Sequence, residues 1–286
     1  MQGKASIAPS LYLYGIIQQG QALPENVAAP ILPVLCSGLV ALCELATPQD
    51  FGPEALEEKL QSVEWVTRLA LGHQAVLQAA MAHGPVIPAR LCTLFSTAAA
   101  LRTSLAENEQ RYLALLAWLG DRQEWGLKVL CDEEKLRSVI AEGDPTLRAL
   151  EWDMATASPG GAYLLAKRGA SRRADLAARQ VSDATEEILA AVEQLPLEAC
   201  LRPLPASRAA KGADAILNLA LLADTAALAL FHDAIDSLSR GLLREGFVFE
   251  VTGPWPPYSF CDEQSAAEAG GDGAATDDLA QSMSSQ

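Results

Sequence analysis

The chain has 286 residues, half of them hydrophobic, which is enough for one large or two ordinary domains with substantial cores. Its formal net charge of -15 gives no dominant basic face, so we expect neither nucleic acid nor an anionic membrane surface as a partner. No apolar run approaches the roughly 20 residues that span a bilayer, and no signal peptide is evident at the N-terminus, so we expect a cytoplasmic protein.

Strand patterns dominate the start of the chain. Residues 10–17 (SLYLYGII) predict a first strand, and residues 33–45 predict two more, joined by a tight turn at Ser37-Gly38. Residues 85–95 (PVIPARLCTLF) are extended but contain two internal prolines, which cannot donate ladder hydrogen bonds. This segment therefore predicts an edge or bulged strand.

Two helical patterns complete the first domain. Pro53 opens a stretch that ends at Gly84, and its apolar face consists of Leu56, Leu60, Val63, Val66, Ala70, His73, Leu77 and Met81. On that face His73 is either a hydrogen-bonded core histidine or a ligand or base, and we favour the core position. Ser96 is placed to cap a second helix, whose stripe consists of Leu101, Leu105, Tyr112, Leu115 and Leu119.

Residues 122–261 predict a second domain with the element order strand, long helix, strand, strand, helix, strand. The long helix is expected at residues 162–195, and the strands at residues 124–132, 199–205, 215–223 and 247–253. This order is typical of a ferredoxin-like, split βαβ fold. The predicted fold class is therefore α+β: an N-terminal α+β domain at residues 1–121, this second domain, and a disordered acidic tail at residues 262–286.

Catalytic and metal-binding patterns are scarce. The six cysteines include no CxxC pair and the three histidines are scattered, so we expect free, mostly buried thiols, no metal site and no cofactor. Phosphate-binding and dinucleotide-binding glycine loops, GxSxG and HExxH are all absent from the sequence. Only Glu124 and Glu250 lie in predicted strands, and alternation is expected to turn both toward solvent. The sequence therefore disfavours an enzyme.

The long helix combines a narrow apolar seam with an unusual charge layout. The seam has a period of 3.5 and consists of Ala174, Ala177, Val181, Ala184, Ile188, Ala191 and Leu195. Basic residues crowd the N-terminal half and acidic residues the C-terminal half, the reverse of what the helix dipole favours. The face is either simply solvated, or a docking surface for an acidic or self-similar partner with Arg172 and Arg173 as candidate partner-binding residues.

The stretch VTGPWPPYSF (residues 251–260) is a free peptide ligand, a partner-binding platform or a structural cap. A WW-type ligand needs Pro-Pro-x-Tyr, whereas Tyr258 directly follows Pro257 here. We favour a rigid cap whose aromatic residues fold back over a sheet or the long helix of the second domain. Its motif residues are Gly253, Trp255, Pro256, Pro257, Tyr258 and Phe260.

Several blocks occur in an order known from one protein family. They include YLYGII (residues 12–17), GPVIPARLCTLF (84–95), EWGLKV (124–129), GAYLLAKR (161–168), NLALLA (218–223) and VTGPWPPYSF. Over about residues 10–260 the chain thus resembles the gas vesicle protein family that contains GvpF and GvpL. It departs from the family pattern at Leu91-Cys92, where the family usually has an aromatic residue followed by glycine.

The resemblance implies a non-enzymatic accessory or minor structural component of gas vesicles, which are gas-filled protein shells in the cytoplasm. It implies binding to the hydrophobic shell subunit and to other gas vesicle accessory proteins, and two α+β domains, the second ferredoxin-like. The apolar face of a shell subunit aggregates unless it is covered, and an edge strand or helix-lined groove of the N-terminal domain is the better candidate to cover it. Val86, Arg90 and Leu94 on the predicted edge are then candidate partner-binding residues, and the oligomeric state stays open.

Two other classes of function remain as alternatives. Ferredoxin-like domains often bind ligands between paired sheets, so the chain is alternatively a small-molecule regulatory module. An enzyme is the third class, disfavoured by the missing catalytic patterns. A stabilising metabolite in a thermal-shift screen would support the module, and stabilisation by the shell subunit alone would support assembly.

Overall fold

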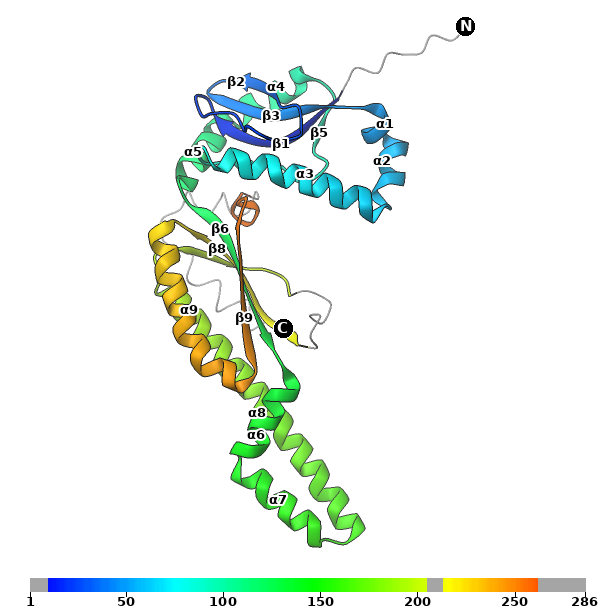
Figure 1. The fold of residues 1–286 in the computed structure, drawn as a ribbon, viewed down its shortest axis with the longest axis vertical. Helices are drawn as coiled ribbons and strands as arrows, with labels where there is room; N and C mark the ends of the chain where they lie inside the picture. The colour runs from blue at the N-terminus through cyan, green and yellow to red at the C-terminus, as the bar shows by residue number, and fades with distance from the viewer. Residues whose placement is uncertain (1–9, 205–212, 262–286) are drawn as a thin grey trace. The chain divides into compact units, whose positions relative to one another are not determined.

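The computed structural model describes residues 10–204 and 213–261 (Figure 1). Helices and two antiparallel sheets alternate along the chain, which confirms the predicted α+β class. The described residues form two compact units: residues 10–124 together with residues 254–261, and Trp125–Gly253. This corrects the sequence-based boundary, which assigned residues 254–261 to the second domain. The predicted acidic tail at residues 262–286 lies outside the described residues.

The first unit contains a sheet with the strand order β2-β3-β1-β4, in which β5 also pairs with β1. Its strands are β1 (Ser10–Gln18), β2 (Leu32–Cys36), β3 (Leu39–Ala46), β4 (Ile87–Pro88) and β5 (Leu94–Phe95). Ser37 and Gly38 have φ values of 47° and 84°, as a two-residue type I′ hairpin requires. The three N-terminal strands and the extended edge segment are thus confirmed.

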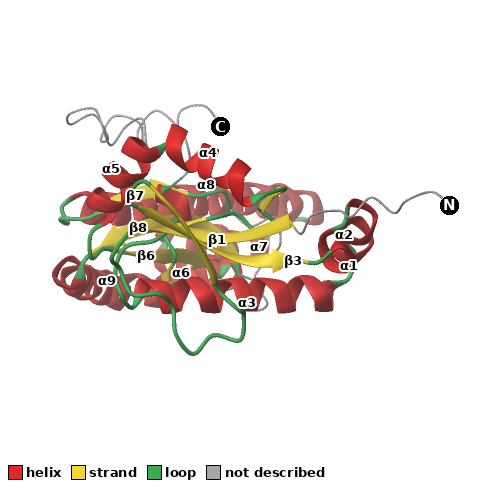
Figure 2. Ribbon diagram, turned by 90° about the horizontal axis from the view of Figure 1, so that it is seen from above, coloured by secondary structure: helices red, strands yellow, loops and turns green. Residues whose placement is uncertain are grey.

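The helices of the first unit are α1 (Pro48–Phe51), α2 (Pro53–Leu60), α3 (Val63–Met81), α4 (Ala98–Glu107) and α5 (Glu109–Leu119). Both views show α3 lying against β1 and β3 (Figures 1 and 2). The single helix predicted from Pro53 is divided, because the Ser62 side chain caps α3 by accepting a hydrogen bond from the Trp65 N–H at 3.3 Å. The second predicted helix is also divided at Asn108, and Thr97 rather than Ser96 caps its first part.

The second unit contains a four-stranded sheet with the order β7-β8-β6-β9. Its strands are β6 (Gln123–Cys131), β7 (Glu198–Leu201), β8 (Asp214–Ala223) and β9 (Phe247–Trp255), and its helices are α6 (Glu133–Gly143), α7 (Pro145–Thr156), α8 (Pro159–Glu193) and α9 (Thr225–Glu245). The predicted sequence of strands and the two main helices is observed. Helix α7 was not predicted; it runs antiparallel to the N-terminal half of α8, and the two form a helical hairpin (Figure 1).

The core of the second unit lies between its sheet and the helices α8 and α9. Leu127, Leu219 and Phe231 are fully buried there and pack with the C-terminal half of α8. The predicted seam of α8 is buried or half-buried from Ala177 onward, whereas Ala174 is exposed. The long helix is therefore held by the core over its C-terminal half and by α7 over its N-terminal half.

Candidate partner-binding surfaces

The candidate edge of the first unit offers few free side chains. Strands β4 and β5 line the edge of β1 opposite β3. Val86 is only 1% exposed and belongs to the core, and Leu94 is half-buried against the same core. Arg90 alone of the three predicted residues is exposed. The structure therefore does not bring Val86, Arg90 and Leu94 together on one accessible surface.

Near this edge His73 and Tyr12 form a buried polar pair, of which the sequence analysis had named His73 but not its partner. His73 is 2% exposed, and the Tyr12 hydroxyl lies 2.7 Å from its Nδ1, while its Nε2 lies 3.1 Å from the Ala89 carbonyl oxygen. Because a carbonyl only accepts, Nε2 carries the proton and Nδ1 accepts from Tyr12. Burial lowers the pKa of His73 to about 4, so the ring is neutral. His73 is thus a satisfied core histidine, as predicted.

The neighbouring groups complete this polar core. Tyr14 packs on the His73 ring, and its hydroxyl donates to Glu44, whose pKa is raised by burial. Cys92 has φ 64°, in the left-handed region that favours glycine. The departure from the family pattern at Cys92 therefore keeps the backbone conformation of a glycine although a side chain is present.

Helix α3 presents an exposed stripe of uncharged residues, of which the sequence analysis had named only Val63. Val63 is 79% exposed and Leu71 is 66% exposed. Thr67 and Ala75 continue the same spacing of four residues and are also exposed. Val63 and Ala70, which the sequence analysis placed on the apolar face, are exposed, whereas His73 and Leu77 of that face are buried. The predicted face therefore meets the core only over the C-terminal half of α3.

The two arginines predicted as docking residues are engaged inside the helical hairpin. The Arg172 guanidinium donates to both carboxylate oxygens of Asp144, at 2.9 and 2.7 Å, and Arg173 lies 3.7 Å from Glu151. Asp144 also caps α7 by accepting from the Leu147 N–H at 2.8 Å. The Arg172 guanidinium holds the pKa of Asp144 at about 2. Both arginines therefore attach α8 to α7.

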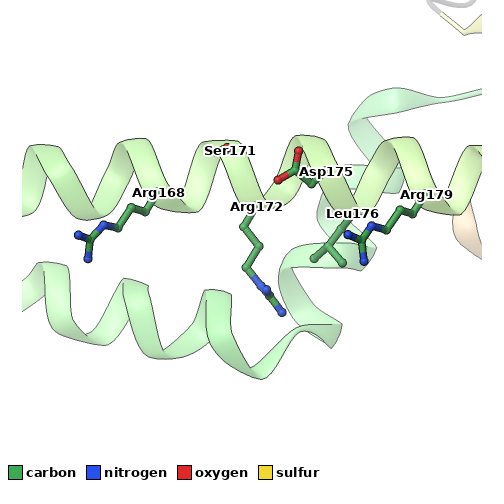
Figure 3. A pocket seen from close by; sticks show the side chains of 6 residues that line it. All are labelled: Arg168, Ser171, Arg172, Asp175, Leu176 and Arg179. Atoms are coloured by element: carbon green, nitrogen blue, oxygen red, sulfur yellow. The ribbon is translucent and has the colours of Figure 1, made fainter.

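Three arginines of α8, Arg172 among them, lie around open depressions. Arg168, Arg172 and Arg179 project toward one side of the helix (Figure 3) and line a cavity of about 300 Å³ together with Ser171, Asp175 and Leu176. A neighbouring cavity of about 630 Å³ shares Leu176 and Arg179. Its floor is apolar, with Ile140, Ala184 and Leu242, and its rim is mostly acidic, with Asp183, Glu187 and Glu245.

The closing stretch packs in the first unit. The Ser259 N–H and hydroxyl both donate to the Glu124 carboxylate at 2.8 Å, and Phe260 is buried with its ring centroid 6.5 Å from that of Trp118. Tyr258 contacts the core cluster around Tyr12. These contacts favour a structural cap, but over the first unit and not the second. Trp255 is 40% exposed and contributes less to it than predicted.

Glu124 itself corrects the sequence analysis. Strand alternation predicted both strand glutamates to face solvent, and Glu250 does so, but Glu124 is only 2% exposed. Its burial comes from Ser259, 135 positions away in the sequence. A local strand pattern contains no signal for a covering segment that remote.

All six cysteines lie among the described residues, and none of them forms a disulfide bond. Within residues 10–204 and 213–261, three or more metal-ligating side chains do not gather at any point. In that same part of the chain, none of the helices has the length and apolar character needed to cross a membrane.

Comparison with known proteins gives consistent matches. The family model described as gas vesicle synthesis protein GvpL/GvpF matches residues 10–262. Gas vesicle protein F of Streptomyces sp. (strain CB03234) is 32% identical over 260 residues, covering 88% of this chain and 100% of the relative. Gas vesicle protein L of the same strain is 28% identical and covers 81% of this chain and 85% of the relative.

Solved structures match the fold at lower sequence identity. The crystal structure of the gas vesicle protein GvpF from Anabaena sp. PCC7120 superposes with a TM-score of 0.62 at 16% identity, covering 89% of this chain and 98% of that one. GvpF from Microcystis aeruginosa gives a TM-score of 0.60 at 18% identity, with 88% and 99% covered.

Proposed function

The chain belongs to the gas vesicle synthesis protein GvpL/GvpF family, and we propose that it acts in gas vesicle assembly as a non-catalytic accessory or minor structural protein. It works by binding the hydrophobic shell subunit and other gas vesicle proteins, at the gas vesicle in the cytoplasm. The family supports the gas vesicle role, and the shell subunit as partner follows from the need to cover an apolar subunit surface before assembly.

The exposed stripe of α3 is the observation that supports binding through the first unit. Val63, Thr67, Leu71 and Ala75 follow one another at four-residue spacing on the solvent side of the helix, and none of them is charged. Val63 and Leu71 are more than half exposed, which costs hydration free energy unless a partner covers them. An apolar helix face of this kind fits the helix-in-groove or helix-on-helix mode of recognition.

The strand edges of the first unit are less suited to binding the shell subunit by strand addition. Val86 is buried, and Pro88 in β4 has no N–H to offer an added strand. At the other edge, β2 contains Pro33, which lacks the same donor. Proline at both edges is a known protection against strand addition. The proposed contact therefore moves from the predicted edge to α3.

A co-purification experiment tests this contact. Val63→Glu with Leu71→Glu introduces two charges at exposed positions, and the helix should be kept because glutamate has a helix propensity close to that of leucine and better than that of valine. We expect the double variant to lose most of the shell subunit that co-purifies with the native protein, and cells carrying it to form fewer vesicles by electron microscopy. Leu230→Glu, at a half-exposed position of α9, is the matched control and should bind as the native protein does. Equal binding by all three proteins would refute the α3 contact.

The alternative function, a small-molecule regulatory module, concerns the second unit and can be tested directly. Its strand order β7-β8-β6-β9, with helices after β6 and after β8, supports the ferredoxin-like description. A metabolite that raises the melting temperature in a thermal-shift screen would favour the module. We expect stabilisation by the shell subunit and not by metabolites.

A further inference from the structure

Three helices of the second unit surround an open depression that the proposed function leaves unused. Helices α6, α8 and α9 pack against one another, and the depression of about 630 Å³ is lined by residues of all three (Figure 1). That volume is within the roughly 300–1,000 Å³ of ordinary ligand pockets. Along α8 the lining runs from Leu176 to Glu187, which is about 16 Å or three turns of helix. The depression is therefore long enough to receive side chains of a short peptide segment.

The inner part of the depression is apolar. Each of the three helices contributes to it, with Val139, Ile140, Leu176, Ala184 and Leu242. Gly143, the last residue of α6, also lines the depression, and a Cβ added there would meet no heavy atom within 4 Å. The depression is thus free of side chains at this point. Burial of a partner's apolar side chain against these residues would be favourable, because it removes apolar surface from water.

The rim of the depression carries more negative charge than the chain itself neutralises. Apart from Asp144, which is bound to Arg172, its carboxylates are those of Asp183, Glu187 and Glu245. The first two form no ion pair within the described residues, and the third accepts a hydrogen bond from the neutral Gln180 amide at 2.8 Å. Arg179 is the only base among the described lining residues. Three carboxylates against one guanidinium leave two negative charges without a counterpart.

We propose that this depression binds a short, basic, amphipathic helix of a partner protein. The apolar side chains of that helix enter the depression, and its lysine or arginine residues pair with the rim. Asp183 and Glu187 are one helical turn apart, so two basic residues four positions apart on the partner match them. This is the helix-in-groove mode of recognition, with charge complementarity to select the partner. The proposal depends neither on the gas vesicle role nor on the contact made by α3.

The test has to separate this depression from general attraction, because any basic peptide is drawn to a chain with a net charge of -15. Two fluorescent peptides of about three helical turns serve as probes, one with leucine and lysine on opposite faces and one with glutamate in place of lysine. Fluorescence anisotropy is measured with the full chain at about 0.15 M salt, which screens distant charges. We expect the lysine peptide to bind with a dissociation constant of about micromolar size and the glutamate peptide not to bind.

Two variants change the depression itself. Gly143→Trp places a ring in the depression at a helical position with room for a side chain, and Glu187→Lys reverses a charge on the rim. Each should raise the dissociation constant of the lysine peptide about tenfold or more. Gly241→Trp and Glu186→Lys make the same changes at exposed positions outside the lining and should leave it unchanged. Circular dichroism should show the native helix content in all four variants.

Several results would overturn the proposal. These are a native protein that does not bind the lysine peptide, a Gly143→Trp variant that binds it as tightly as the native protein, and a Glu186→Lys variant that weakens binding as much as Glu187→Lys. Spermine that competes as well as the unlabelled peptide would show that charge alone is recognised and would exclude a helix. A native dimer in sedimentation velocity that Gly143→Trp abolishes would make a second copy the occupant.

The α3 contact and this site are tested separately. The double variant Val63→Glu with Leu71→Glu should bind the lysine peptide as the native protein does, because α3 belongs to the first unit and the depression to the second. Gly143→Trp should in turn retain the shell subunit in co-purification. Failure of one contact therefore leaves the other to be judged by its own measurement.

Discussion

The two units of this protein differ in how far apart along the chain the partners of their buried polar hydrogen bonds lie. In the first unit His73 bonds with Tyr12 across 61 positions and Glu124 with Ser259 across 135. In the second unit the buried Thr185 hydroxyl donates to the Val181 carbonyl oxygen, four residues away on the same helix. Apart from the tyrosine hydroxyls, His73, Glu124 and Thr185 are the buried polar or charged side chains among the described residues.

This difference assigns different sensitivities to the two units. A long-range polar bond in a buried site fails when either partner is removed or protonated, because the remaining group is left unpaired. A helix-internal bond leaves the backbone ladder in place when it is lost. We therefore expect the first unit to respond to pH and to changes near the end of the described chain, and the second to respond mainly to apolar packing.

The largest expected effect breaks the closure of the first unit. Phe260→Ala removes a buried ring and should lower the free energy of unfolding of that unit by about 4 kcal/mol. Trp255→Ala, at a partly exposed ring of the same segment, should cost about 1 kcal/mol. Hydrogen exchange of the β1 and β3 amides measures both, with the β8 amides as reference. Equal loss of protection in β8 would show that the units do not respond separately.

The next largest expected effect is that low pH destabilises the first unit more than the second. The pKa of His73 is lowered to about 4 in the folded state, against an ordinary value near 6.5. Between these values the unfolded chain binds the proton and the folded one does not, so stability is complete above pH 6.5 and falls as the pH is lowered toward 4. The loss should be about 3 kcal/mol for the first unit.

Two substitutions test whether His73 causes this pH dependence. His73→Gln preserves one donor and one acceptor but cannot titrate. The free energy of unfolding of the first unit should therefore change less between pH 6.5 and 4. His83→Gln, at an exposed position, should leave the slope as it is. If the stability of the His73 variant still fell between pH 6.5 and 4 as in the native protein, His73 would not be the cause of the acid sensitivity.

The charged bond between Glu124 and Ser259 provides an intermediate effect. Glu124→Gln replaces one of two accepting oxygens by a donor that faces the Ser259 backbone or hydroxyl, and should destabilise the first unit by about 2 kcal/mol. The change should be visible in denaturant unfolding. Glu250→Gln in β9 alters the same functional group at an exposed site, and its transition midpoint should match that of the native protein.

The smallest expected effect is the loss of the local hydrogen bond of Thr185 in the second unit. Thr185→Val keeps the branched shape of the side chain and removes only a bond to a carbonyl that already belongs to the helix ladder. We expect a change of less than about 0.5 kcal/mol in the second unit by thermal unfolding. A loss comparable with that of Glu124→Gln would contradict the distinction between local and long-range polar bonds.

Local patterns predicted the strands and the long helix because their signals lie within a few residues. The Ser37-Gly38 turn and the seam from Ala177 are of this kind. The break before Val63 was missed because the capping Ser62 interrupts an apolar spacing that otherwise reads through. Helix α7 was missed although its start carries a local signal, because the Asp144 side chain caps it and Pro145 is its first residue.

The candidate surfaces were predicted less well than the fold, for a related reason. Alternation and spacing indicate which residues share a face, but not which face is covered. Val86 lies in an edge segment and is nevertheless buried, whereas Leu71 on α3 was not singled out and is exposed. The charge layout of α8 was evident in the sequence, but the engagement of Arg172 and Arg173 with α7 was not.

The placement of residues 254–261 in the first unit has a consequence for synthesis. The ribosome makes residues 10–124 first, yet the segment that carries Phe260 and Ser259 emerges only after the whole second unit has been made. Domains usually fold in the order in which they are translated. Here the unit that starts first lacks the buried Phe260 ring and the Ser259 partner of Glu124 until translation has passed residue 260, so it is the last to reach its native state.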